Sequence, residues 1–293
     1  MTTTTTFTAK DVQELRQRTG AGMMECKKAL EETKGNMDSA IELLRKKGIA
    51  KAEKRAGRAA SEGKIVARVS PDGKTGVLVE VNSETDFVAR NEGFGKLVDQ
   101  IADALLQAGD INEVVANAEG SALLSRKLGS STVEGALKEL SGTIGENLVV
   151  RRYARFTTDG ALGTYVHHNG KVAAMVDVTG GSGEAIQQLA RTVAEHVAAG
   201  VPTVPAAVNR EEVPHDLVDR ERRIFTEQAA ASGKPANIVE KMVGGRIEKY
   251  YKEVTLVDQP WIRDDSKSIR DIVSAAGSGL KIRRFARFQM GQE

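Results

Sequence analysis

The side chains that most often carry chemistry are few in this chain and poorly spaced for it. Of the four histidines only His167 and His168 are neighbours. Because adjacent residues on a strand point to opposite faces, we do not expect this pair to share a metal ion. The single cysteine, Cys26, lies on an apolar helical face, where a buried thiol is expected rather than a nucleophile. Without a phosphate-binding loop, dinucleotide fingerprint or nucleophile elbow, the sequence predicts no catalytic residue, no metal and no cofactor, and favours a binding protein over an enzyme.

Side chains suited to recognition gather in residues 82–96, NSETDFVARNEGFGK. Phe87 stands there between the carboxylate of Asp86 and the cation of Arg90. An apolar ring between opposite charges is typical of a protein-binding element presented by a rigid scaffold. The alternative is a strand-to-helix loop in which Phe87 is buried in the core of its own domain.

An internal repeat indicates the scaffold that carries this segment. Residues 73–81 match residues 170–178 at an offset of 97, and each copy predicts two strands joined by a turn that contains glycine. The helix that follows, residues 97–106, matches residues 189–198 at an offset of only 92. The first copy therefore holds five extra residues between strand and helix, within the recognition segment.

The hydrophobic periodicity predicts an α+β fold with small antiparallel sheets. Residues 8–48 are expected to form three short helices, the first capped by Thr8 and the third ended by Gly48. Residues 107–147 are expected to be mostly helical. The strands expected in the two copies cover residues 64–70, 75–82, 153–157, 163–168 and 171–179.

Residues 216–251 predict an antiparallel helical hairpin. Each of its helices carries one narrow apolar stripe, and a Gly-Lys-Pro turn at 233–235 joins them. Narrow stripes are typical of a helix pair that projects from a body in the manner of a coiled coil. Gly244 and Gly245 in the second helix are expected to mark a bend or a close approach. A helix at 268–276 and a strand at 281–289 are expected to follow.

The length of 293 residues, with 40% apolar and 28% charged residues, is that of a globular chain with more than one domain. We expect residues 1–54 to form a three-helix, UBA-like domain with a basic linker. Residues 55–150 are expected to form a first core subdomain, and residues 151–293 a related second one that carries the hairpin at about 214–252.

The charge and cysteine content limit the partners and the compartment. A net charge of +2 gives no general tendency to bind nucleic acid. Residues 45–58 nevertheless hold seven Lys or Arg, so an RNA-binding segment stays open beside the alternative of a solvated helical linker. One cysteine excludes an intramolecular disulfide and favours a reducing cytoplasm. No apolar run or leader pattern predicts a membrane span or a signal peptide.

Five longer motifs occur in order along the chain: RQRTGAGMMECKKAL at 16–30, VNSETDFVARNEGF at 81–94, IGENLVVRR at 144–152, SGKPANIVEKMVGGR at 232–246 and RFARFQMG at 284–291. Together they resemble the elongation factor Ts family of guanine nucleotide exchange factors, whose partner is the translational GTPase elongation factor Tu. The resemblance covers nearly the whole chain. It implies an N-terminal three-helix domain, two related core subdomains and a protruding helical hairpin.

The resemblance also implies a function without bond chemistry. The family promotes release of GDP by binding the GTPase domain of elongation factor Tu and disturbing its magnesium and phosphate site, after which GTP rebinds. The residues that match the family's contacts are Asp86 and Phe87, flanked by Thr85, Val88 and Arg90, together with Arg16, Met23, Met24 and His167. His167 matches the family position better than His168.

Several points stay open at this stage. Neighbouring helical positions lie about 100° apart, so one of Met23 and Met24 can be a core residue and the other a contact. Because the sequence stops at Glu293, the further C-terminal helix of some family members is expected to be missing. A homodimer and a heterotetramer with elongation factor Tu are both possible assemblies. The rival functions are RNA binding through residues 45–58 and dimerisation through the hairpin.

Overall fold

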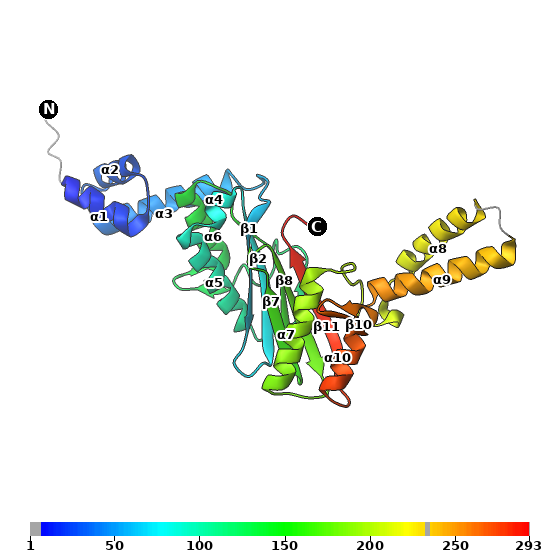
Figure 1. Cartoon of the computed structure of the whole chain (residues 1–293). Helices are drawn as coiled ribbons and strands as arrows, with labels where there is room; N and C mark the ends of the chain where they lie inside the picture. Colours follow the sequence, from blue (N-terminus) through cyan, green and yellow to red (C-terminus); the bar gives the residue numbers. More distant parts are fainter. Residues whose placement is uncertain (1–6, 232–234, 293) are drawn as a thin grey trace. The chain divides into compact units, whose positions relative to one another are not determined.

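A computed structural model describes residues 7–231 and 235–292. These residues, drawn in Figure 1, form two compact units. Unit 1 comprises 7–66, 79–153 and 290–292, and unit 2 comprises 67–78 and 154–289 apart from the undescribed 232–234. The predicted mixture of helices and small antiparallel sheets is confirmed, with the three-helix region at the N-terminus.

Unit 1 begins with the three predicted helices, α1 (Ala9–Thr19), α2 (Met23–Glu32) and α3 (Met37–Glu53). Thr8 caps α1 as expected, because its side chain accepts from the Asp11 N–H while the Asp11 carboxylate accepts from the Thr8 N–H. The buried side chains of the bundle include Leu15, Cys26 and Leu30. These side chains form one small core, in which Cys26 is buried as predicted.

The prediction that Gly48 ends the third helix is wrong, because α3 continues to Glu53. Gly48 lies where α3 packs against α6 (Val133–Ile144), and it faces Gly142 of that helix. A glycine inside a helix costs only about 1 kcal/mol relative to alanine. Close packing of the two helices accounts for a glycine at this position better than a helix end does.

The first sheet has the strand order β1-β2-β6-β3. Its strands are β1 (Glu62–Val69), β2 (Thr75–Ser83), β6 (Val149–Thr157) and the short β3 (Val114–Val115). The sequence assigned β6 to the second copy of the repeat, but it takes its place beside β2 in the sheet of the first copy. Helix α5 (Glu92–Leu106) follows β2 and buries Phe94, Leu97 and Ile101 along one face.

The region between α5 and β6 is less helical than predicted. Besides β3, it contains α6 and the short pair β4 (Lys127–Leu128) and β5 (Ser131–Thr132), while the rest is turns and irregular chain. Gly120 and Gly129 adopt φ of 69° and 61° there. These are left-handed conformations that a right-handed helix does not contain, so the helical prediction fails at these turns.

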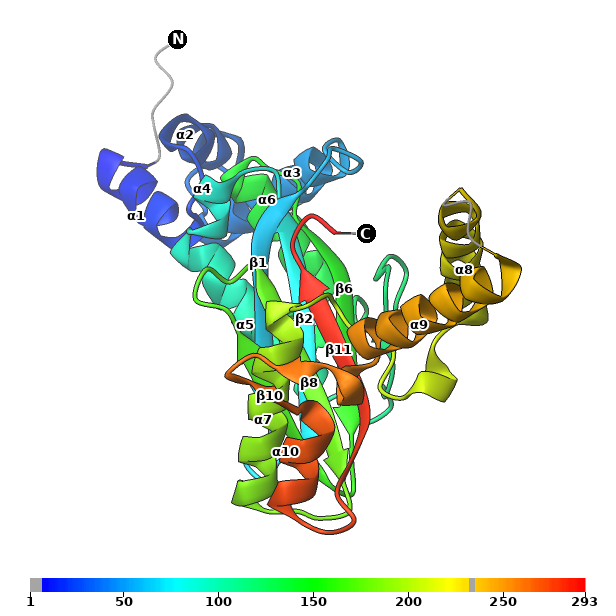
Figure 2. The same ribbon diagram turned by 45° about the vertical axis from the view of Figure 1, so that its right-hand side comes forward.

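Unit 2 contains a second antiparallel sheet with the order β11-β8-β7. Its strands are β7 (Ala161–Val166), β8 (Val172–Thr179) and β11 (Lys281–Gln289). Helix α7 (Glu184–Ala199) packs on this sheet, and its Val193 and Val197 share a core with Val176 of β8 (Figure 2). The C-terminal part adds β9 (Pro260–Trp261), β10 (Asp264–Ser268) and the predicted helix α10 (Ile269–Ala276).

The predicted repeat is present as β1-β2-α5 in one copy and β7-β8-α7 in the other. The two copies differ at the predicted place. Residues 84–91 connect β2 to α5 and contain a one-turn helix, α4 (Asp86–Ala89), whereas only residues 180–183 connect β8 to α7.

The predicted hairpin consists of α8 (His215–Ala230) and α9 (Ala236–Val254), which lie side by side and extend from the rest of unit 2 (Figure 1). Val218, Val243 and Ile247 are buried between them. Of the turn predicted at 233–235, only Pro235 lies within the described residues. Gly244 and Gly245 neither interrupt α9 nor mark a close approach, because a Cβ at either would meet no atom within 4 Å.

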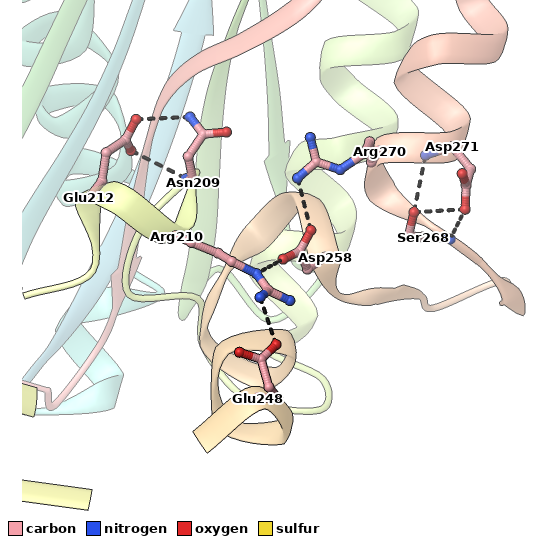
Figure 3. A network of polar contacts seen from close by, with 8 residues as sticks. All are labelled: Asn209, Arg210, Glu212, Glu248, Asp258, Ser268, Arg270 and Asp271. Atoms are coloured by element: carbon pink, nitrogen blue, oxygen red, sulfur yellow. Dashed lines mark hydrogen bonds and ion pairs between the residues drawn. The ribbon is translucent and has the colours of Figure 1, made fainter. Parts of the chain in front are cut away.

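A polar network fixes the base of the hairpin (Figure 3). Arg210, in the short helix η1 (Arg210–Glu212), donates to Asp258 at 2.6 Å and to Glu248 of α9 at 2.8 Å. Asp258 ends the short helix η2 (Leu256–Asp258) and also accepts from Arg270 of α10 at 2.9 Å. Burial acts to raise the pKa of Asp258, but the hydrogen bonds from Arg270 and Arg210 hold that pKa below its ordinary value.

Among the helices of the described residues, none combines the length and the apolar character that a membrane span requires.

Candidate functional site

Helix α4 presents Phe87 to solvent. Thr85 caps the helix, since its hydroxyl accepts from the Val88 N–H at 3.5 Å. The Phe87 side chain is 81% exposed, whereas the neighbouring Val88 is buried. The alternative in which Phe87 is a core residue is therefore wrong. Val88 packs inside unit 1, so its side chain supports α4 and offers no surface of its own.

Opposite charges flank the exposed ring. Arg90 donates to the Asp86 carboxylate at 3.0 Å across one helical turn. Both side chains are largely in water, so this pair contributes at most about 0.5 kcal/mol to stability. It leaves both groups free to exchange their bond for one to a partner.

Two carboxylates attach α4 to the segment that follows α6. Glu146 accepts from the Thr85 N–H at 3.0 Å and from the Thr85 hydroxyl at 2.5 Å. Glu84 in turn accepts from the Asn147 N–H at 2.7 Å. Sequence reasoning missed Glu146, although the residue lies in the motif at 144–152, immediately after Gly145 caps α6. Its place in that motif, directly after the glycine that ends a helix, was the feature of the sequence that could have identified Glu146.

The N-terminal helices contribute a second group of exposed residues in unit 1. Met23 and Met24 are 45% and 61% exposed, so neither is the core residue that their helical spacing allowed. The core position on α2 belongs to Cys26, whose thiol pKa is raised by burial. Arg16 is exposed and forms no ion pair within the described part of the chain.

His167 lies in unit 2, whereas all the other predicted site residues belong to unit 1. Strand β7 ends at Val166, so His167 and His168 occupy the turn beyond it. Their ring centroids are 4.2 Å apart, and the expectation that they face opposite sides of a strand is wrong. The Nδ1 atom of His167 lies 3.2 Å from the Tyr165 hydroxyl.

The described residues do not assemble a metal-binding cluster. No group of three His, Cys, Asp or Glu side chains among them is arranged to hold a metal ion. His196 is fully buried, and burial lowers its pKa although a hydrogen bond with Gln259 opposes the shift. What the arrangement offers chemically is an apolar ring and exposed thioethers for contact with a protein.

The basic run at 45–58 is mostly engaged in ion pairs inside unit 1. Arg45 pairs with Glu139 at 2.5 Å and Lys47 with Glu32 at 2.6 Å, and Lys51 pairs with Glu25. Through residue 53 the run is part of α3. This geometry agrees with a helical linker, because these cations already have carboxylate partners on the neighbouring helices α2 and α6.

Comparison with known proteins gives one consistent result. The family described as "Elongation factor TS" matches residues 84–292 of the chain. The protein named Elongation factor Ts of Thioalkalivibrio sulfidiphilus is 46% identical over 289 residues, covering 98% of this chain and 93% of that protein. Those of Aquifex aeolicus and Prosthecochloris aestuarii are 42% and 43% identical and cover 96% and 97% of this chain, and 97% and 99% of their own lengths.

Proposed function

The chain belongs to the elongation factor Ts family and is thus a translation elongation factor, and from this premise we propose that it binds elongation factor Tu and accelerates release of GDP from it. GTP then rebinds to the vacated site. The observation that carries the proposal is the exposure of Phe87 on a short helix whose start is held by Glu146.

Phe87 supplies the binding free energy at the centre of the contact. Transfer of one such ring from water into the partner contributes about 2 kcal/mol. Because Thr85 and Glu146 already order α4, little conformational entropy is lost when the ring docks. That energy helps to offset distortion of the magnesium-holding region of the GTPase.

Exchange follows from differential binding. A factor that binds the nucleotide-free GTPase more tightly than the GDP form must weaken GDP binding by the same ratio. Asp86 is suited to compete for polar groups that otherwise serve magnesium or phosphate once it releases Arg90. No covalent bond forms or breaks, so the proposed activity needs no catalytic residue, and the protein is a nucleotide exchange factor rather than an enzyme of bond chemistry.

The proposal includes two further contacts with the same partner. Arg16, Met23 and Met24 form one on the N-terminal helices, where two exposed thioethers fit an adaptable apolar surface. His167, at the end of β7, forms the other from unit 2. The three-domain division at 1–54, 55–150 and 151–293 and a place in the cytoplasm belong to the same proposal.

Release of a fluorescent GDP analogue from elongation factor Tu tests the function. We expect the protein to accelerate release, and Phe87→Ala to reduce the effect by roughly 30-fold, the equivalent of about 2 kcal/mol of apolar burial. Val114→Ala is the matched control, because Val114 is also an exposed apolar residue of unit 1, at 52%, but lies outside the proposed contact. An inactive wild-type protein would refute the function, and normal exchange by Phe87→Ala would refute the site.

A further inference from the structure

The end of α6 touches both segments of unit 1 that carry the proposed contact residues. Gly142, in its last turn, packs against α3 of the N-terminal helices. Glu146, four positions later, holds the start of α4. These two contacts are independent of each other, and neither residue is itself strongly exposed.

The contact at Gly142 is a backbone-to-backbone approach. A Cβ atom at position 142 would lie 2.6 Å from both the Cα and the carbonyl oxygen of Gly48, which no real contact permits. The Arg45–Glu139 pair at 2.5 Å and a hydrogen bond from Arg55 to the Ser141 carbonyl at 3.3 Å flank the approach. The close backbone approach and its two flanking polar contacts therefore fix how α3 packs against α6.

Helix α3 is also attached to α2, which carries Met23 and Met24. Lys47 pairs with Glu32 at 2.6 Å and Lys51 pairs with Glu25, two residues from Met23. The two helices also share a core that contains Cys26 and Ala40. The packing of α3 against α6 consequently determines where Met23 and Met24 lie in unit 1.

The contact at Glu146 acts on Phe87 in the same manner. Its carboxylate accepts both hydrogen bonds that Thr85 donates, and its carbonyl accepts from the Ser141 hydroxyl of α6 at 2.6 Å. Thr85 caps the one-turn helix that Phe87 belongs to. The end of α6 therefore fixes the orientation of the Phe87 ring as well as the position of the two methionines.

We propose that the end of α6 is the positioning element of the partner-binding surface: Gly142 places Met23 and Met24, and Glu146 places Phe87. The inference rests on the proposed function. Two contacts held on one rigid body reinforce each other, because the first raises the effective concentration of the second. Gly142 and Glu146 are positioning residues, since they act through other side chains.

The GDP-release assay with Gly142→Ala and Gly48→Ala tests the first half. Both substitutions add one methyl group inside a helix, but a Cβ at 48 would meet Gly142 Cα at 3.7 Å, an ordinary contact. We expect Gly142→Ala to raise the half-saturating concentration of the factor by roughly tenfold as the bivalent contact loosens. Gly48→Ala is expected to change it by less than about twofold, since it requires no helix displacement.

Double-mutant cycles separate positioning from general destabilisation. We expect the effect of Gly142→Ala to vanish when Met23 and Met24 are both alanine, and that of Glu146→Ala to vanish in Phe87→Ala. Each should also be smaller in the other background, because a single remaining contact has no bivalent gain to lose. Glu146→Gln, which keeps one acceptor for Thr85, should recover part of the loss caused by Glu146→Ala.

The outcomes are decisive. Effects that add in every background, or normal half-saturation for both Gly142→Ala and Glu146→Ala, would overturn the inference while leaving exchange by the wild type intact. Failure of the wild type to release GDP would instead refute the proposed function, and the inference with it. If Gly142→Ala does not fold, as judged by its thermal transition, the Glu146 and Phe87 cycle decides alone.

Discussion

Phe87 and Glu146 differ in how much of their role could be predicted from the sequence. Phe87 could be singled out because it lies in an insertion between charged neighbours, but a one-turn helix is too short for periodicity to say whether its ring is buried. Glu146 is one of 40 acidic residues and becomes distinctive only when the fold brings it to 3.0 Å from the Thr85 N–H. Phe87 could be proposed as a contact residue from the sequence, whereas its support by Glu146 could not be predicted.

We expect His196 to make the stability of unit 2 depend on pH. Its Nε2–H donates to Gln259 at 2.9 Å and its Nδ1 accepts from the Ile262 N–H at 3.4 Å, so the buried ring is neutral. Burial lowers its pKa in the folded state. The unfolded state therefore binds more protons, and the contribution of His196 is complete above the ordinary histidine pKa and is lost as the pH falls below it. We expect the free energy of unfolding to decrease from pH 7 to pH 5.

Urea denaturation at the two pH values measures this effect. The His196→Gln variant should be less stable at pH 7, since it loses part of a buried hydrogen-bonded arrangement, but should show a smaller decrease toward pH 5. A variant with the wild-type pH dependence would contradict the assignment. Acidic groups such as Asp258, whose pKa is lowered, lose their contribution only at still lower pH.

At the scale of elements, periodicity predicted the long helices and most of the long strands, because each buries one regular face. Helix α5 and helix α7 are examples, and their buried residues follow the helical repeat. The prediction was wrong for Gly48 and for residues 108–132. Gly48 is explained by a tertiary contact, and residues 108–132 contain glycines in left-handed turns. Neither feature produces a hydrophobic periodicity that could be recognised in the sequence.

The hairpin depends on the network around Arg210. We expect Arg210→Ala to destabilise the base of α9 by about 1 kcal/mol, because hydrogen bonds to Asp258 and Glu248 are lost and Asp258 keeps only Arg270. Hydrogen exchange of the amides near the end of α9 measures this local stability. Lys249→Ala is the control, since the exposed Lys249–Glu253 pair at 3.7 Å contributes less than about 0.5 kcal/mol. Equal exchange in both variants would exclude a special role for the network.

For the whole molecule, the proposed function requires reciprocity between two ligands of elongation factor Tu. The factor by which this protein weakens GDP binding must equal the factor by which GDP weakens binding of this protein. Titration calorimetry of each ligand with and without the other measures both ratios. Unequal ratios would indicate a further species, such as an oligomer, that a simple exchange cycle does not contain.

The overall class, the repeat and the hairpin could be predicted from the sequence because each leaves a long-range pattern. The division into compact units could not, since three of its boundaries fall inside strands: between Val66 and Ala67, between Leu78 and Val79 and between Tyr153 and Ala154. Such boundaries depend on which residues meet in space, and the local sequence around them is that of an uninterrupted strand.

The unequal connections of the two copies have a consequence for how this chain can change over generations. Both copies keep the strand-turn-strand-helix framework, yet only residues 84–91 hold an additional helix, while residues 180–183 make the same link without one. The shorter link shows that the framework can join its strand to its helix without an additional helix, so α4 is not needed to connect β2 to α5. Substitutions in residues 84–91 can therefore alter the additional helix while the framework keeps its connection, except at Thr85 and Val88, which contact the rest of unit 1.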